Sequence, residues 1–206
     1  MGKLHLVIGN KNYSSWSLRP WIAMTMAGIP FKETMVLLDR PDTRRKIAAH
    51  SPSGRVPVLK DGKLAIRASL ARLEYLAERF PEKNLWPRQV AARAMARAIS
   101  CEMHAGFSAP RNACPMNLRR PRKAVTMNTA IRKDVARIEE VWRNCRKKFG
   151  KGGKFLFGRF SIADAMFAPV VTRLDTYAIK VAPDTRAYME AVMATDRKST
   201  RLNSSH

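Results

Sequence analysis

The chain has few cysteines and no long run of apolar residues. Its three cysteines are Cys101, Cys114 and Cys145. They are widely spaced and odd in number, which argues against a metal site and against a disulfide framework. We therefore expect reduced thiols, no bound metal and a cytoplasmic location. No apolar run reaches the roughly 18–20 residues of a membrane-spanning helix, and the N-terminal MGKLHLVIGN becomes polar too soon for a signal peptide.

Acidic residues are also scarce. Asp and Glu number 16 against 39 Lys and Arg, a net charge of +23. By count along the sequence, residues 1–82 carry +7, residues 83–195 carry +14 and residues 196–206 carry +2. A field of this size favours polyanions in a salt-dependent way. Because the cations are scattered and not interleaved with aromatic residues, we favour a solvated basic surface. Any binding to nucleic acid should be non-specific.

A length of 206 residues with 46% hydrophobic residues predicts one compact globular domain or two small ones. The first 80 residues predict the order β-α-β-α-β-β-α. The strands are expected at 3–8, 31–38, 56–60 and 63–67, and the helices from Ser14 or Ser15 to Ala27, within 40–50, and from Ser69 to 80. Asp61-Gly62 is a strong signal for a two-residue hairpin. Gly28 should end the first helix.

Residues 81–87 predict a linker because of their prolines and polar residues. The remainder is helical in pattern, so residues 88–195 should form an all-helical domain. Three long helices are expected: one with Met95, Ile99, Met103 and Phe107 on its apolar face, one over 131–149 and one over 162–178. The polar segment 196–206 has no periodicity. We interpret it as a non-native tail outside the fold, such as translated adapter DNA would produce, attached to a C-terminally truncated domain.

Three short motifs could carry chemistry or structure. A cis bond between Val56 and Pro57 would expose the Val56 backbone to an extended peptide ligand, although most Val-Pro pairs are trans. Ser69 at a helix start is either an ordinary N-cap or a carboxylate-binding hydroxyl beside free backbone N–H groups. Ser161 and Asp164 are spaced as a capping box, and we assign them a structural role only.

Four segments together resemble a cytosolic glutathione S-transferase: YSSWSLRPW, SPSGRVPVL, ASLARLEYLAERFP and FLFGRFSIADAMFAPVVTR. The resemblance covers residues 3–195, and it is nearest to the bacterial zeta-like or maleylacetoacetate-isomerase-like branch. It implies a thioredoxin-like N-terminal domain over residues 1–80, an all-α C-terminal domain and a homodimer. It also implies glutathione as co-substrate and a small electrophile as acceptor.

The resemblance assigns roles to single residues. Ser14 would hydrogen-bond the glutathione sulfur, and Ser15 would support it or cap the helix. The Val56 backbone ahead of Pro57 would hold the cysteinyl unit, Ser69 the γ-glutamyl carboxylate, and Arg55 the glycine carboxylate. Candidates for an apolar acceptor pocket, with core packing as the alternative, are Trp16, Met103, His104, Phe107 and Met116.

Departures from the family pattern keep other functions open. Ala68 stands where the family usually has an acid or glutamine, Trp16 replaces the cysteine of the zeta motif, and Thr176 stands where zeta enzymes have an arginine. One alternative is a non-catalytic transferase-fold protein that binds a protein partner, as stringent starvation protein A does. Another is a glutathione-dependent cis-trans isomerase. Direct nucleic-acid binding rests on charge alone.

Overall fold

The computed structural model describes residues 3–51 and 53–203, with side chains through Thr195. Four strands form one sheet in the order β2-β1-β3-β4. Their bounds are β1 His5–Ile8, β2 Lys32–Met35, β3 Val58–Asp61 and β4 Leu64–Ile66. β1 pairs in parallel with β2 and antiparallel with β3, and β3 pairs antiparallel with β4. The predicted element order of the first 80 residues is confirmed.

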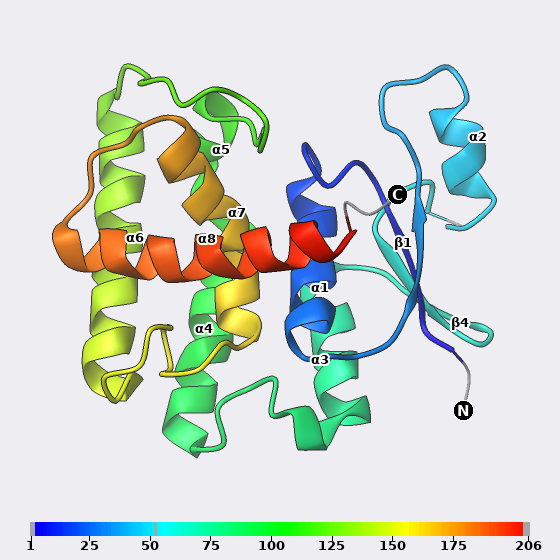
Figure 1. Ribbon diagram of the computed structural model, residues 1–206, viewed down its shortest axis with the longest axis horizontal. Coiled ribbons are helices and arrows are strands. Elements are labelled where there is room, and N and C mark those ends of the chain that lie inside the picture. The colour runs from blue at the N-terminus through cyan, green and yellow to red at the C-terminus, as the bar shows by residue number, and fades with distance from the viewer. Residues whose placement is uncertain (1–2, 52, 204–206) are drawn as a thin grey trace.

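Both faces of the sheet are covered by helices. The bounds of these helices are α1 Ser15–Met26, α2 Thr43–Ala48 and α3 Ser69–Arg79. Side chains alternate along β1: Leu6 and Ile8 join the main core, whereas Val7 packs with Ile47 of α2 in a small second core. α1 and α3 therefore lie on the face towards the rest of the chain and α2 lies on the outer face (Figure 1).

The hairpin is confirmed, but its loop lies one residue later than predicted. Asp61 pairs with Leu64, so Gly62 and Lys63 form the two-residue loop. Gly62 has φ +58, the left-handed conformation that such a turn requires and that glycine adopts without steric cost. Asp61 stays in the strand, where its carboxylate accepts a hydrogen bond from the Tyr75 hydroxyl at 2.6 Å and pairs with Arg79.

The segment predicted as a linker is ordered and partly buried. It begins with a turn of 3-10 helix, η1 Pro81–Lys83. Leu85 and Trp86 then insert into the main core and are 7% and 6% exposed. The backbone N–H of Ile162 donates to Leu85 O at 2.9 Å, which ties this connection to the start of a C-terminal helix.

The second unit consists of five helices within the described residues: α4 Val90–Ala105, α5 Ser108–Ala113, α6 Thr129–Phe149, α7 Ile162–Thr176 and α8 Pro183–Asn203. The first predicted helix is shorter than its apolar pattern suggested. α4 ends at Ala105, and Phe107 lies in a left-handed turn with φ 57 before α5. Met95 is 39% exposed and so is not a core residue.

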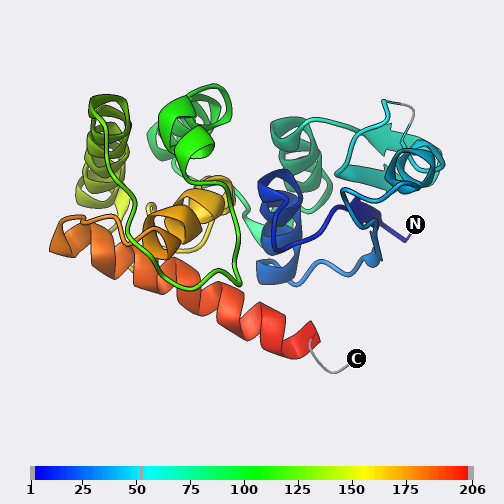
Figure 2. The same cartoon turned by 90° about the horizontal axis from the view of Figure 1, so that it is seen from above.

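α8 corrects the expectation that the helical pattern breaks off before residue 196. Its backbone continues as helix through Asn203, so the polar composition of residues 196–203 does not end it. The helix lies across α6, α7 and the first unit's α1 (Figures 1 and 2). Whether residues 196–206 are native to the domain stays a prediction.

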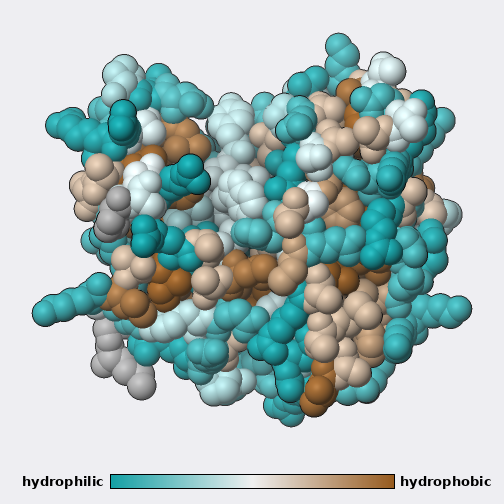
Figure 3. Space-filling model, turned by 180° about the vertical axis from the view of Figure 1, so that it is seen from behind, coloured by the Kyte–Doolittle hydropathy of each residue, from teal (hydrophilic) through white to brown (hydrophobic). Residues whose placement is uncertain are grey.

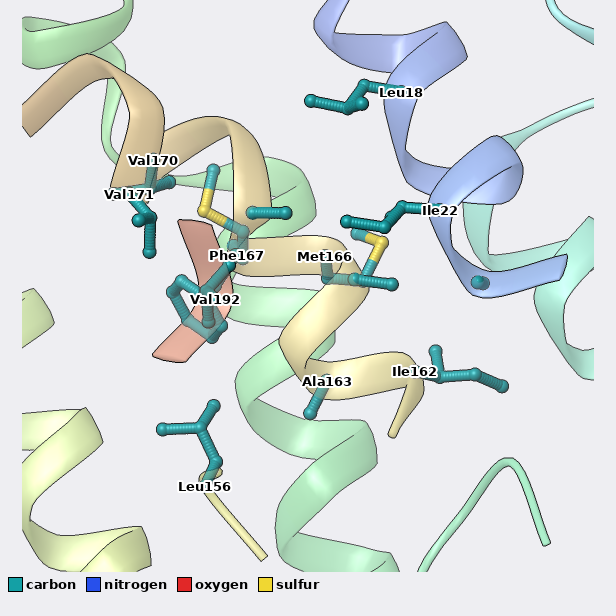
Figure 4. Close-up of a cluster of buried hydrophobic side chains, with 14 of the residues drawn as sticks. Leu18, Ile22, Leu156, Ile162, Ala163, Met166, Phe167, Val170, Val171 and Val192 are labelled. Carbon is teal, nitrogen blue, oxygen red and sulfur yellow. The ribbon is translucent and has the colours of Figure 1, made fainter. Parts of the chain in front are cut away.

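α7 is the central helix of the molecule, and it joins the two units. The capping box at its start is confirmed: the Asp164 carboxylate accepts hydrogen bonds from the Ser161 N–H at 2.9 Å and from the Ser161 hydroxyl at 2.8 Å. Ile22 of α1 is directed towards Met166 of α7, and Leu18 extends from α1 to the same side (Figure 4). The fold is therefore a thioredoxin-like α/β unit packed through α1 against a helical unit, as predicted.

Among the described residues, no helix is long and apolar enough to cross a membrane. The three cysteines are free thiols, with Cys101 exposed and Cys114 and Cys145 buried. Burial raises the pKa of the Cys145 thiol to about 11, which keeps it protonated and unreactive at neutral pH.

Candidate functional site

Three serines surround the start of α1. Ser14 is the N-cap of the helix, and its hydroxyl oxygen accepts from the Ser17 N–H at 3.3 Å. The same hydroxyl donates to Ser17 Oγ at 2.8 Å, and Ser17 Oγ also accepts from the Gly9 N–H at 2.9 Å. Ser15 is the first residue of the helix, so of its two expected roles the helix cap is wrong, and support of Ser14 stays a prediction. The capping geometry needs an extended residue ahead of the helix, and Ser14 supplies it with ψ 91.

The loop before β3 lies at the same edge of the sheet as the start of α1. The peptide bond between Val56 and Pro57 is cis, as the extended-peptide interpretation required. Val7 pairs with Val58, so Pro57 lies beside the end of β1, and α1 starts seven residues after that end. The Val56 backbone has no hydrogen-bond partner among the residues that the structure describes. Its N–H and C=O are therefore free to pair with a ligand.

Ser69 occupies the first position of α3 and does not cap it. The N-cap is Ala68, which has φ 66 and offers no side-chain oxygen. Ser69 is 2% exposed, and its hydroxyl accepts a hydrogen bond from Arg72 at 3.3 Å. Arg72 also donates to the Pro57 carbonyl at 2.6 Å, so the loop before β3 and the start of α3 are in contact. Arg55 is exposed beside that loop.

The five residues proposed for an acceptor pocket divide into two groups. Met103, Phe107 and Met116 are buried in the main core at 0%, 7% and 4% exposure, so they serve packing. Trp16 and His104 keep exposed surface and contact each other edge to face, with ring centroids 5.3 Å apart. Since Trp16 belongs to α1 and His104 to α4, this pair lies where the two units meet.

The surface of Trp16 is also covered by two cations. The guanidinium carbons of Arg19 and Arg111 lie 4.5 Å and 5.3 Å from the Trp16 ring centroids. Arg111 is anchored on the carbonyls of Met103 and His104. Burial and the charges of Arg19 and Arg111 lower the pKa of His104, so this imidazole is neutral at neutral pH. From behind, the molecule shows a notch between its two lobes, with a pale floor of intermediate hydropathy (Figure 3).

The sequence interpretation missed the buried arginines. Arg19, Arg72 and Arg173 are 1%, 2% and 8% exposed, and none forms an ion pair with an acid among the described residues. Arg19 donates to Met166 O at 3.0 Å across the two units, and Arg173 donates to Cys114 O at 2.9 Å. Burial lowers the pKa of Arg19 to about 9 and that of Arg173 to about 10. The sequence did contain a signal for burial, because an arginine that falls on the apolar face of a predicted helix should be buried with it.

Two surface hollows lie elsewhere. One is lined by Met95, Ile99 and Val141 between α4 and α6, and the other by Trp86 and Phe157 near the connection between the units. Neither is lined by a residue of the predicted glutathione site or acceptor pocket, although Ser161 of the capping box borders the second. The predicted residues instead converge at the sheet edge formed by the start of α1, the Val56-Pro57 loop and the start of α3.

Comparison with known proteins identifies the family. The model of the glutathione S-transferase N-terminal domain matches residues 13–79, and the model of the C-terminal domain of the same family matches residues 117–191. The chain belongs to the glutathione S-transferase family. The matched N-terminal segment contains the serines of α1, the cis bond and Ser69, which are the residues that carried the resemblance.

Individual relatives of this transferase-family chain are distant. It is 28% identical over 174 residues to glutathione S-transferase Z1 of Arabidopsis thaliana, covering 78% of this chain and 75% of that protein. It is 26% identical over 174 residues to maleylacetoacetate isomerase of Rattus norvegicus, covering 82% and 78%. A glutathione transferase homologue from Burkholderia, solved with bound glutathione, superposes with a TM-score of 0.71 at 19% identity and covers 97% of both chains. This last likeness shows the fold alone.

Proposed function

We propose that this chain is a glutathione transferase that activates the thiol of glutathione for attack on a small electrophile. One observation carries the proposal: the start of α1, the Val56-Pro57 loop and the start of α3 meet at one edge of the sheet. This arrangement supplies a helix N-terminus with hydroxyls, a free extended backbone segment and a second helix N-terminus. The first of these groups suits a thiol, the second a peptide backbone and the third a carboxylate, and glutathione contains all three.

The chemistry is stabilisation of a thiolate. A free thiol has a pKa of about 8.5, so only a few per cent is ionised at neutral pH. The N-terminus of α1 carries positive partial charge, and a hydroxyl donor beside it favours S⁻ over SH. Each unit by which the thiol pKa falls corresponds to about 1.36 kcal/mol. Serine suits this role because it donates a hydrogen bond and does not itself compete as a nucleophile.

Ser14 is the proposed donor, and the contact with Ser17 supports that role. The two hydroxyl oxygens are 2.8 Å apart, and either can donate to the other without movement of heavy atoms. When Ser17 donates to Ser14, the Ser14 proton becomes available to the sulfur. Ser17 is fully buried and held by the Gly9 N–H, so it keeps Ser14 in place.

The remaining groups hold the tripeptide and the acceptor. The Val56 backbone pairs with the cysteinyl unit, Ser69 and the free N–H groups of α3 receive the γ-glutamyl carboxylate, and exposed Arg55 reaches the glycine carboxylate. Trp16 and His104 form the wall against which the electrophile lies. We also propose a homodimer in the cytoplasm, as the family resemblance implies.

A second candidate is a transferase-fold protein without catalysis that binds a protein partner. Two observations favour it: Ala68 offers no acid to the ammonium group of glutathione, and the whole chain carries a net charge of +23. A glutathione-dependent isomerase is a third candidate, because maleylacetoacetate isomerases are among the relatives.

Calorimetric titration with glutathione, followed by conjugation to a generic aryl halide, tests the proposal. Binding at sub-millimolar concentration with measurable conjugation supports a transferase. The Ser69→Ala variant should weaken binding. The Ser100→Ala variant is the matched control, because the Ser100 hydroxyl is buried and donates to Ala96 O within its own helix α4. Absence of binding at millimolar glutathione would favour the non-catalytic protein.

A further inference from the structure

Arg72 cross-links two segments of the proposed glutathione site. It lies one helical turn after Ser69 on α3 and is 2% exposed. One guanidinium nitrogen donates to the Pro57 carbonyl at 2.6 Å, and the other donates to Ser69 Oγ at 3.3 Å. Arg72 therefore fixes the position of two segments relative to each other. One is the loop with the Val56 backbone, and the other is the start of α3 with Ser69.

The charge of Arg72 has no acidic counterpart. Among the described residues it forms no ion pair, and its Nε is buried without a hydrogen-bond partner. Burial lowers its pKa to about 10, so the guanidinium is still charged at neutral pH. The neighbouring Arg67 and Lys63 are exposed cations, and Ala68 adds no negative charge. A buried cation in such surroundings favours a nearby anion.

The hydrogen bond from Arg72 also determines what the Ser69 hydroxyl can do. A guanidinium only donates, so Ser69 Oγ accepts from Arg72 and keeps its own proton. In the part of the chain that the structure describes, that proton has no acceptor. It is therefore available to a ligand, together with the unpaired N–H groups in the first turn of α3. All of these groups recognise a carboxylate, and none recognises an ammonium group.

We propose that Arg72 is a positioning residue that makes this end of the site specific for a carboxylate and indifferent to an ammonium group. This rests on the proposed function, in which the carboxylate is that of the γ-glutamyl unit. Arg72 orients the Ser69 hydroxyl and supplies uncompensated positive charge behind it. The α-amino group of the same unit contributes little to binding, because no acid faces it from Ala68.

Titration of three thiol peptides tests the proposal: glutathione, 4-aminobutyryl-cysteinyl-glycine, which lacks the α-carboxylate, and glutaryl-cysteinyl-glycine, which lacks the α-amine. For the unmodified chain, loss of the carboxylate should weaken binding by about tenfold or more, and loss of the amine by less than about threefold. In Arg72→Met the penalty for losing the carboxylate should shrink to less than about threefold. Arg72→Lys should retain part of it.

Arg79→Met is the matched control, since Arg79 lies at the other end of α3 and pairs with Asp61. It should keep the full penalty for losing the carboxylate. Ser69→Ala should reduce that penalty with Arg72 still in place, because the hydroxyl that Arg72 orients is gone, and this keeps the proposal testable if Arg72→Met does not fold. Circular dichroism reports folding of each variant.

The outcomes separate this proposal from the proposed function. If glutathione binds and the carboxylate penalty persists in folded Arg72→Met, or in Ser69→Ala, Arg72 only packs the site and the inference is wrong. A loss of affinity of tenfold or more for the peptide without the amine would refute the claimed indifference to ammonium. If the unmodified chain binds none of the three peptides, the proposed function falls and the inference with it.

Discussion

Ser14 Oγ and Ser17 Oγ lie 2.8 Å apart, and Ser17 Oγ is also 2.9 Å from the Gly9 nitrogen. The buried Ser17 thus connects the proposed thiolate donor to the end of β1. Replacement by alanine leaves the Gly9 N–H without an acceptor, at a cost of about 1–3 kcal/mol in stability. It also removes the group that frees the Ser14 proton.

We therefore expect Ser17→Ala to raise the pKa of bound glutathione and lower turnover while leaving glutathione affinity unchanged. The pH profile of aryl halide conjugation gives the thiol pKa, and calorimetry gives the affinity. Ser100→Ala controls for loss of a buried hydroxyl. An unchanged profile in Ser17→Ala would mean that Ser17 serves the fold only.

Ser14 and Ser15 should differ in both stability and chemistry. Because Ser14 caps α1, Ser14→Ala should lower the free energy of unfolding by about 1 kcal/mol. It should also raise the bound-thiol pKa and reduce turnover. Loss of one preorganised donor costs up to about 2.7–4 kcal/mol, and less here because the helix N-terminus remains. Ser15→Ala should spare stability.

Denaturant titrations and conjugation profiles of both variants make the comparison. A loss of turnover confined to Ser15→Ala would transfer the thiolate contact to Ser15. Equal small effects on turnover would leave both serines with a structural role.

Ala68→Glu should tighten glutathione binding. An acid at this position would meet the γ-glutamyl ammonium, and a hydrogen bond to a charged group contributes about 1.5–3 kcal/mol. Ala71→Glu places the same charge on an exposed residue in the first turn of α3 and controls for interaction with the helix dipole. If both substitutions change the calorimetric affinity equally, the gain comes from the added negative charge at the start of α3 and not from a contact with the ammonium group.

Asp164 should make stability depend on pH. Burial raises the pKa of its carboxyl from the ordinary 3.8 to about 6. A raised folded-state pKa means that the stabilising contribution is complete below the unfolded value and is lost as pH rises through about 6. Relative to Asp164→Asn, the chain should lose about 2 kcal/mol of unfolding free energy between pH 4 and pH 7. Urea titrations across that range measure the difference, and parallel curves for the two proteins would contradict the prediction.

Nucleic-acid binding, where it occurs, should follow charge alone. Phosphate neutralisation dominates such contacts, so affinity for DNA or RNA should fall steeply with salt and should not depend on sequence. Fluorescence anisotropy with two unrelated oligonucleotides at several salt concentrations measures both effects. Selective binding that survives high salt would show that the basic surface is a specific site.

The sequence alone determined the element order, the two units, the family and the capping box at Ser161 and Asp164. These features depend on local signals: apolar periodicity, turn residues and helix caps. It also indicated the segments of the site, since Ser14, Val56-Pro57 and Ser69 occur in motifs of fixed order. Element ends were less certain, as with α4 and the hairpin loop, because one residue more or less hardly changes a periodic pattern.

Only the tertiary structure decided which side chains are buried and what they contact. Apolar side chains are equally suited to a ligand pocket and to a core, so the sequence could not decide between the two for Met103, Phe107 and Met116. Long-range packing places them in the core. The same holds for Arg72: its position on α3 is local, but its contact with Pro57 joins residues that are 15 positions apart. Burial of a cation depends on which segments fold over it, so no local pattern in the sequence reveals it.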